Sequence, residues 1–144
     1  MSFLEDRLNG EDHDLVLQMG VCRGFVRIAA PVTLAWRRHP QSETGDFTSN
    51  ILGALRLVVR EKSGTYPGGS ERSRERRRII GRHTRPVALA CLRKDALKQG
   101  WKLYRATLKW NLQLGQWKYV LGFPILALLA FLSRAFRAHH KGIQ

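Results

Sequence analysis

The chain has 144 residues, enough for about one domain with a modest core, and 44% of them are hydrophobic. This hydrophobic content is ordinary for a globular protein and argues against disorder throughout the chain. Lys and Arg number 25 against 11 Asp and Glu, a net charge of +14, which favours nucleic acid or an anionic membrane surface as the partner.

Arginine supplies most of the positive charge. Its planar guanidinium makes bidentate contacts with phosphate, so this bias favours phosphate-bearing partners. A GC-rich genome, or a reading frame that overlaps another gene, enriches arginine without any partner. A weakly selected product with little fold is the corresponding alternative.

The chain begins with an acidic segment. Five of the eleven acids lie in the first fourteen residues: Glu5, Asp6, Glu11, Asp12 and Asp14. The segment lacks the basic start and apolar run of a secretory signal, so we expect the protein to begin in the cytosol. Ser2 and Glu5 fit a capping box for a short helix, and Asn9-Gly10 predicts a turn. We interpret the acids as a solvated terminus, with a fold back onto the basic body as the alternative.

The predicted N-terminal half spans residues 1–62 and contains short helices or strands. Its segment 15–36 is rich in apolar residues but is interrupted by arginines and a proline, so helix and strand both remain open. The polar stretch 36–50 predicts a loop. Asn50 is expected to cap a helix over 51–62, where apolar residues recur at helical spacing.

Residues 63–85 predict a flexible linker that includes an arginine-rich basic segment. Gly, Pro and Ser dominate residues 63–70. Seven arginines follow: Arg72, Arg74, Arg76, Arg77, Arg78, Arg82 and Arg85. We predict that they bind the phosphates of nucleic acid or acidic lipid. A nuclear-import signal and a solvated linker without a partner are the alternatives.

Residues 86–144 form the predicted C-terminal part. Apolar and aromatic residues recur at helical spacing opposite a row of lysines, which predicts a cationic amphipathic helix interrupted by Gly100. Apolar residues then alternate, and Gly115-Gln116 suits a type II′ turn, so a short β-hairpin near 108–122 is the alternative to continued helix. We favour helix. The predicted fold class is mainly α, as a small single domain or as two halves joined by a flexible Gly/Pro/Arg-rich middle.

Aromatic residues concentrate among the bases of this part of the chain: Trp101, Tyr104, Trp110, Trp117 and Tyr119. Such rings stack on bases, form a belt at a membrane interface, or fill a core. Trp117 and Tyr119 directly precede an apolar run, which favours the interfacial role for this pair.

The apolar run extends from Tyr119 to Ser133. Its 15 uncharged residues span about 22 Å as a helix, against a hydrocarbon slab about 30 Å thick. Lys118 and Arg134 can reach the headgroups and recover part of the difference. The run therefore predicts a marginal membrane helix, either spanning, interfacial or re-entrant. The residues expected to anchor it are Trp117, Tyr119, Leu121, Phe123, Ile125, Leu126, Leu128, Leu129, Phe131 and Leu132.

No motif for catalysis, for a cofactor or for a metal is present. The five histidines are scattered or terminal, and none stands beside a nucleophile and an acid in a known pattern. Cys22 and Cys91 stand singly in apolar contexts, so we expect two buried thiols rather than metal ligands. We therefore expect no enzyme, no cofactor and no small-molecule substrate.

The sequence thus predicts a small, basic, non-enzymatic membrane-associated protein. It anchors or docks through residues 117–136, as a single-pass or peripheral protein, and binds nucleic acid, ribonucleoprotein or acidic lipid through the arginine-rich segment. A viral matrix-like or accessory protein, or a subunit of a membrane complex, combines these features. The expected location is the cytosolic face of a host or organelle membrane, with a C-terminal anchor. The alternative is a soluble nucleic-acid-binding protein, nucleocapsid-like or ribosome-associated, that is nuclear or cytoplasmic with RNA and uses the apolar run as its core helix.

Overall fold

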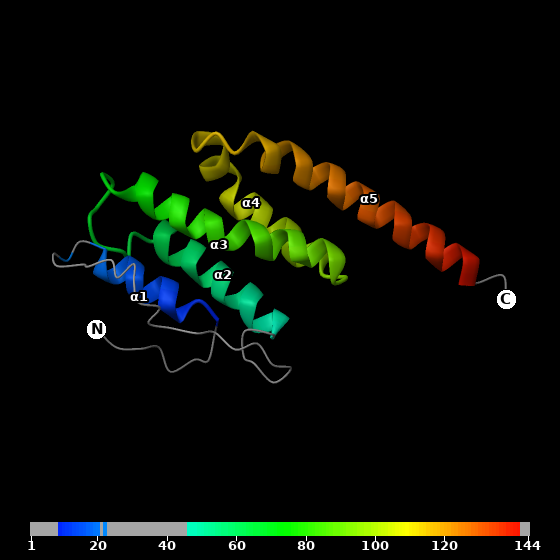
Figure 1. Ribbon diagram of the computed structural model, residues 1–144, viewed down its shortest axis with the longest axis horizontal. Helices are drawn as coiled ribbons and strands as arrows, with labels where there is room; N and C mark the ends of the chain where they lie inside the picture. The colour runs from blue at the N-terminus through cyan, green and yellow to red at the C-terminus, as the bar shows by residue number, and fades with distance from the viewer. Residues whose placement is uncertain (1–8, 21, 23–45, 142–144) are drawn as a thin grey trace, which may run out of the picture. The chain divides into compact units, whose positions relative to one another are not determined.

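The chain is mainly α-helical, as the sequence predicts (Figure 1). The computed structural model describes residues 9–20, 22 and 46–141, with side chains described through residue 135. Five helices and no strand occur within these residues. The chain forms two compact units, Met1–Ser73 and Arg74–Gln144, and the division lies inside the segment predicted to be a flexible middle.

The first unit contains α1, Glu11–Met19. Three acids in its first turn lie at the positive end of the helix dipole, where negative charge is favourable. Gly10, before the helix, has a φ of 106°, so the predicted Asn9-Gly10 turn is confirmed. The predicted helix at Ser2 lies outside the described residues, as does most of the segment 15–36.

α2, Phe47–Lys62, begins one turn earlier than predicted. The carboxylate of Asp46 accepts hydrogen bonds from the backbone amides of Thr48 and Ser49 at 3.0 and 3.3 Å. Asp46 is therefore the N-cap, and the prediction of Asn50 in that position is wrong. The side chain that satisfies the free amides of the first turn decides where the helix begins.

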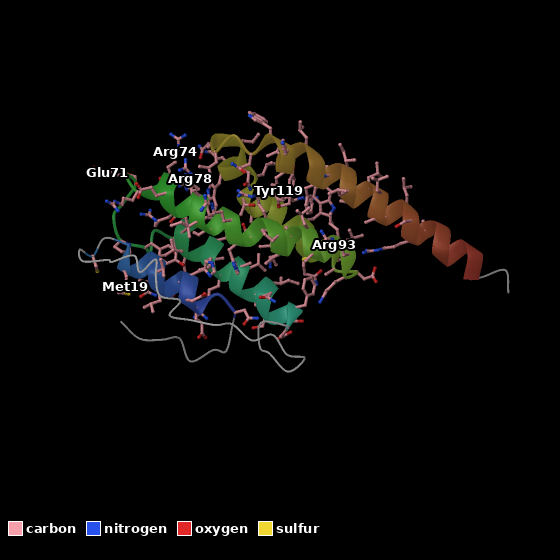
Figure 2. The ribbon with its side chains drawn as sticks, in the orientation of Figure 1. Met19, Glu71, Arg74, Arg78, Arg93 and Tyr119 are labelled. Atoms are coloured by element: carbon pink, nitrogen blue, oxygen red, sulfur yellow. The ribbon has the colours of Figure 1, made fainter. Side chains whose placement is uncertain are left out.

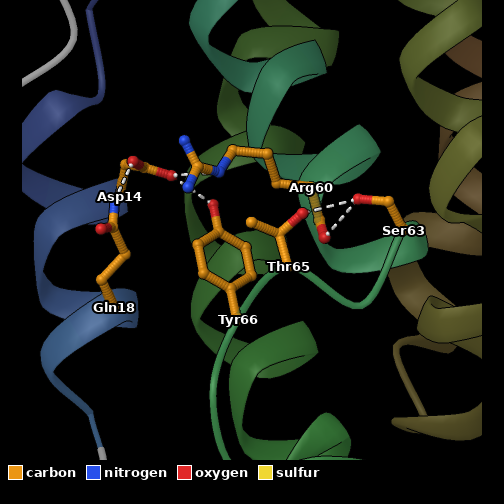
Figure 3. Close-up of polar contacts among 6 residues, drawn as sticks. All are labelled: Asp14, Gln18, Arg60, Ser63, Thr65 and Tyr66. Atoms are coloured by element: carbon orange, nitrogen blue, oxygen red, sulfur yellow. Dashed lines mark hydrogen bonds and ion pairs between the residues drawn. The ribbon is translucent and has the colours of Figure 1, made fainter. Parts of the chain in front are cut away.

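Asp14 of α1 is buried at the centre of a polar network in the first unit (Figure 3). Its carboxylate accepts hydrogen bonds from the Tyr66 hydroxyl at 2.6 Å and from Nε2 of Gln18 at 2.7 Å. Nε of Arg60, on α2, lies 3.2 Å from the same carboxylate. Burial, and then the hydrogen bond to Asp14, raise the pKa of the Tyr66 hydroxyl. The Gly/Pro-rich segment 63–70 is thus anchored to α1 by its one aromatic side chain.

α3, Ser73–Arg93, includes most of the arginine-rich segment. The predicted flexible middle is not confirmed here, because the chain is helical from Ser73 onward. α3 also continues through Pro86, where the sequence indicated a boundary. The fixed φ of proline suits a helix, and the cost is one missing hydrogen bond to the carbonyl of Arg82.

α4, Leu97–Gln113, crosses α3 at Gly100. A Cβ atom at Gly100 would lie 3.0 Å from Cβ of Cys91 and 3.2 Å from the carbonyl oxygen of Ala88. The predicted interruption at Gly100 is wrong, because α4 is continuous there. Gly100 instead permits the close approach of the two helices. The turn between them contains Asp95 with a φ of 56°.

A second turn joins α4 to α5, Trp117–Lys141. Gly115 has a φ of 67°, and the amides of Gln116 and Gly115 donate to the carbonyls of Asn111 and Leu112 at 2.9 and 3.1 Å. This hydrogen-bond pattern is a Schellman motif, which ends a helix at a left-handed glycine. The β-hairpin alternative at 108–122 is therefore not confirmed, because the glycine ends a helix and does not join two strands.

α5 packs on α4 through a narrow aromatic seam. Phe123 is fully buried and stacks on Tyr104, with ring centres 4.6 Å apart and planes at 9°. The ring of Trp101 meets Phe123 edge-on, with centres 5.3 Å apart. Ala127, one turn further along α5, is also buried.

Arg134 ties the far part of α5 to the end of α3. Its Nη2 donates to the carbonyl oxygen of Leu92 at 2.7 Å, and its Nε lies 2.7 Å from the carboxylate of Asp95. The carbonyl of Leu92 is in the last turn of α3, where carbonyls lack helical donors and a cation is favourable.

Candidate membrane and phosphate interface

The apolar stretch of α5 is mostly exposed. By length and composition, α5 is able to cross a membrane over Trp117–Ala135, and 11% of that window is buried inside the molecule. Eight of the ten residues predicted to anchor it have exposed side chains: Trp117, Leu121, Ile125, Leu126, Leu128, Leu129, Phe131 and Leu132. Four of these residues recur at spacings of four, three and four and share one side of the helix. This apolar stripe consists of Leu121, Ile125, Leu128 and Leu132.

The other two predicted anchors, Tyr119 and Phe123, face inward. They are four residues apart and lie on the seam, with ring centres 5.8 Å from each other. The interfacial role predicted for the pair Trp117 and Tyr119 therefore suits Trp117, which is 57% exposed. Tyr104 and Trp110, which also had a possible role in stacking on bases, are buried in the second unit.

Six of the seven predicted phosphate-binding arginines lie on α3. The seventh, Arg72, is in the first unit, where its Nη1 donates to the carbonyl of Gly20 at 3.2 Å. Three exposed arginines recur every four residues along one side of α3 and form an arginine row: Arg74, Arg78 and Arg82. Figure 2 labels the first two, near the start of the helix. Among the described residues, none forms an ion pair or hydrogen bond with the side chains of this row.

The remaining three arginines are less accessible. Arg76 is buried. The guanidinium of Arg77 lies 5.4 Å from the ring centre of Trp110, a cation–π contact. Nη1 of Arg85 donates to Oδ1 of Asn111 at 3.1 Å. The structure thus separates the predicted set into an exposed row and side chains that contribute to packing.

An open groove of about 420 Å³ lies between α3 and α5. Its cationic and polar lining residues are Arg82, Arg85, Lys118 and Tyr119. Its apolar lining residues are Pro86, Leu89, Phe123 and Leu126. A Cβ atom on Gly122, which also lines it, would meet no other atom within 4 Å, so the groove is open at this position. Periodicity alone could not reveal the groove, because its walls come from two helices that are distant in sequence.

Metal and thiol chemistry have little support in the described part of the chain. No group of three or more His, Cys, Asp or Glu side chains there could hold a metal ion. Cys91 is buried, as predicted, and burial raises the pKa of its thiol. Cys22 is exposed, so the prediction of a buried thiol is wrong at that position.

The second unit therefore presents an apolar stripe, an arginine row and a groove that is charged at one end. Comparisons with protein families, curated proteins and solved structures found no match. The function must be inferred from these surfaces.

Proposed function

We propose that this chain is a small, basic, non-enzymatic membrane-associated protein. It docks through α5 and binds the phosphates of an anionic partner through α3. The observation that carries the proposal is the exposure of the apolar stripe on a chain of net charge +14. A continuous exposed apolar surface is typical of an interaction site. The positive charge repels a second copy of the chain and attracts anionic headgroups.

The energies suit reversible docking. The stripe side chains are between 52% and 64% exposed. Full burial of an exposed leucine is worth about 2 kcal/mol, so four half-exposed side chains supply several kcal/mol. Each Lys or Arg close to an anionic surface adds about 1 kcal/mol.

The start of α5 suits the headgroup layer. Trp117 is exposed, and the neighbouring Lys118 is exposed as well. Tryptophan is enriched at the membrane–water interface. The apolar part of a lysine side chain lies along the hydrocarbon while its ammonium group contacts the lipid phosphates.

The arginine row supports a phosphate-bearing partner, namely nucleic acid, ribonucleoprotein or acidic lipid. Arg74 lies in the first turn of α3, at the positive end of the helix dipole, so a bound phosphate gains from the dipole and from the guanidinium. The alternative, a soluble nucleic-acid-binding protein, needs the apolar run as its core. The exposure of the stripe favours membrane docking over that alternative.

Vesicle flotation tests the docking. We expect the protein to float with vesicles of phosphatidylcholine mixed with phosphatidylserine, and more weakly with phosphatidylcholine alone. Replacement of the four stripe residues by Gln should abolish flotation. The matched control replaces four exposed apolar side chains outside α5 by Gln, namely Val16, Leu52, Val59 and Ile79, and should float normally.

Two results would contradict the proposal. One is normal flotation of the stripe variant. The other is a dimer of the wild-type chain that the stripe variant loses, without any vesicle binding, because the stripe would then bind a second copy.

A further inference from the structure

The groove between α3 and α5 has a charged end and an apolar end. The two helices run in the same direction within the second unit (Figure 1), so the lining residues follow one another in the same order along both walls of the groove. Arg82 and Arg85 therefore share one end of the groove with Lys118. Leu89 and Leu126, which come later in the two helices, line the other end.

The charged end of the groove has no carboxylate among its described lining residues. None of the described residues that line the groove is Asp or Glu. Arg85 is oriented by its hydrogen bond to Asn111 and keeps further donors free for a ligand. Burial, with a contribution from the charge of Arg82, lowers the pKa of Arg85. An anion in the groove would offset this cost of keeping the guanidinium charged.

The apolar end selects against small hydrophilic anions. Leu89 and Leu126 offer hydrocarbon surface that inorganic phosphate would leave bare. A neutral hydrocarbon would bury the cations without a partner, which is unfavourable. The volume of about 420 Å³ lies within the range of about 300–1,000 Å³ that is usual for small-molecule sites. A molecule with an anionic head and an acyl chain matches both ends.

We propose that the groove binds one anionic phospholipid molecule. Arg82, Arg85 and Lys118 hold its phosphate. One acyl chain lies along Pro86, Leu89 and Leu126. The guanidinium forks favour phosphate as the head group, because they contact two of its oxygens at once. This proposal deepens the proposed membrane function, on which it rests for the supply of lipid, by naming the lipid class.

Calorimetric titration with soluble single-chain lipids tests the site. We expect lysophosphatidic acid, below its micelle concentration, to bind with one site per chain. Lysophosphatidylcholine and oleate, with the same chain length, should bind at least tenfold more weakly. Equal affinity for lysophosphatidylcholine would overturn recognition of the negative charge, and equal affinity for oleate would overturn recognition of phosphate.

Two groove-filling variants test the location. Gly122→Leu places a side chain in open space and should abolish the titration signal. Ala135→Leu places the same side chain at an exposed position of α5 outside the groove and should bind normally. Leu126→Glu, at an exposed position, introduces a carboxylate into the groove and should also abolish binding. Normal lipid binding by both groove variants would overturn the proposal.

A charge variant tests the head-group site. Arg82→Gln with Lys118→Gln should weaken lysophosphatidic acid binding at least tenfold. Lys98→Gln with Lys102→Gln removes the same charge from exposed positions of α4 and should change the affinity less than twofold. Equal losses in the two double variants would show that net charge, not the groove, binds the lipid.

The two proposals fail in different ways. The stripe residues do not line the groove, so the variant with four Gln substitutions should still bind lysophosphatidic acid. Gly122→Leu should still float with vesicles. If the wild-type protein binds lysophosphatidic acid but does not float with vesicles, only the docking proposal is contradicted. If it floats with vesicles but does not bind lysophosphatidic acid, only the groove proposal is contradicted.

Discussion

The hydroxyl of Tyr104 donates a hydrogen bond of 2.8 Å to the carbonyl oxygen of Val120. This carbonyl has no helical donor, because the residue four positions later in α5 is Pro124. Tyr104 and Val120 are both buried, so the carbonyl would otherwise be buried without a partner. α4 thus supplies the hydrogen bond that proline removes from α5.

Removal of this hydroxyl should destabilise the second unit. Tyr104→Phe keeps the ring stacked on Phe123 and should lower the free energy of unfolding by about 1–3 kcal/mol. In a Pro124→Ala background the restored backbone amide can bond to Val120, so the same change should cost less than half as much. A double-mutant cycle by urea denaturation measures the difference. If Tyr104→Phe lowered the free energy of unfolding equally in the two backgrounds, Tyr104 would not replace the hydrogen bond that Pro124 removes.

Two helical glycines should respond to alanine with opposite signs. In an unhindered helix, Gly→Ala gains about 0.5–1 kcal/mol. Gly122→Ala should show this gain, because its Cβ meets no atom within 4 Å. Gly100→Ala should lower the melting temperature, because its Cβ would press on Cys91 and on the backbone of Ala88. A stabilising Gly100→Ala would mean that α3 and α4 move apart without cost.

The Tyr66–Asp14 hydrogen bond should make the first unit sensitive to alkali. The pKa of Tyr66 is raised in the folded state above its ordinary value of about 10, so the native state retains a proton that the unfolded chain loses. The contribution to stability is therefore complete below about pH 10 and declines as the pH rises further. Tyr66→Phe should cost about 1.5–3 kcal/mol at neutral pH and flatten this decline.

Native-state hydrogen exchange of the α1 and α2 amides measures that stability apart from the second unit. Wild-type protein and Tyr66→Phe should converge as the pH rises above 10. If the stabilities of the two proteins fell in parallel with rising pH, Tyr66 would not be the cause of the loss of stability in alkali.

The arginine row should oppose folding and favour binding. Like charges four residues apart on a helix repel each other, so Arg74→Gln with Arg78→Gln should raise stability by about 0.3–1 kcal/mol. The same variant should bind single-stranded RNA more weakly and reduce the salt slope by about 1.4, which is the value for two lost phosphate contacts. Lys98→Gln with Lys102→Gln is the charge-matched control. Fluorescence anisotropy over a salt series measures the salt dependence of RNA binding. An equal reduction of the salt slope in both variants would show that the arginine row does not bind the phosphates specifically.

The predictable part of the interface was its composition, whereas the orientation of its side chains depended on tertiary contacts. The sequence does not indicate which of the ten predicted anchoring residues face inward. Tyr119 and Phe123 face inward because Tyr104 of α4 offers a ring against which both pack. The groove depends in the same way on two helices, so no single segment indicates it.

The first residue of α2 likewise could not be predicted from local sequence preferences. Asp46 and Asn50 are both good caps, and local preference does not separate them. The hydroxyl of Ser49 accepts a hydrogen bond from the amide of Asn9 at 3.0 Å, a contact made by the first turn of α2. This long-range contact favours the earlier start.

Asp14 was interpreted with the other acids as part of a solvated terminus. Its burial depends on Tyr66 and Arg60, which are far away in the sequence. Nothing near Asp14 distinguishes it from Asp12, which is exposed. A charge count could therefore not identify the acid that folds back.

If α5 docks on a bilayer as proposed, the contacts of Arg134 with the end of α3 and with Asp95 would set the angle at which α5 meets it. Tyr104 holds α5 near its beginning, and Leu92 and Asp95 hold it further along. In the proposed docking, a helix held at both places would lie flat at the water–hydrocarbon boundary, with only its outer side in lipid. An upright, inserted orientation requires Arg134 to release both partners. In the proposed membrane-bound state, this single guanidinium outside the apolar stripe would therefore decide between a surface-bound and a transmembrane topology.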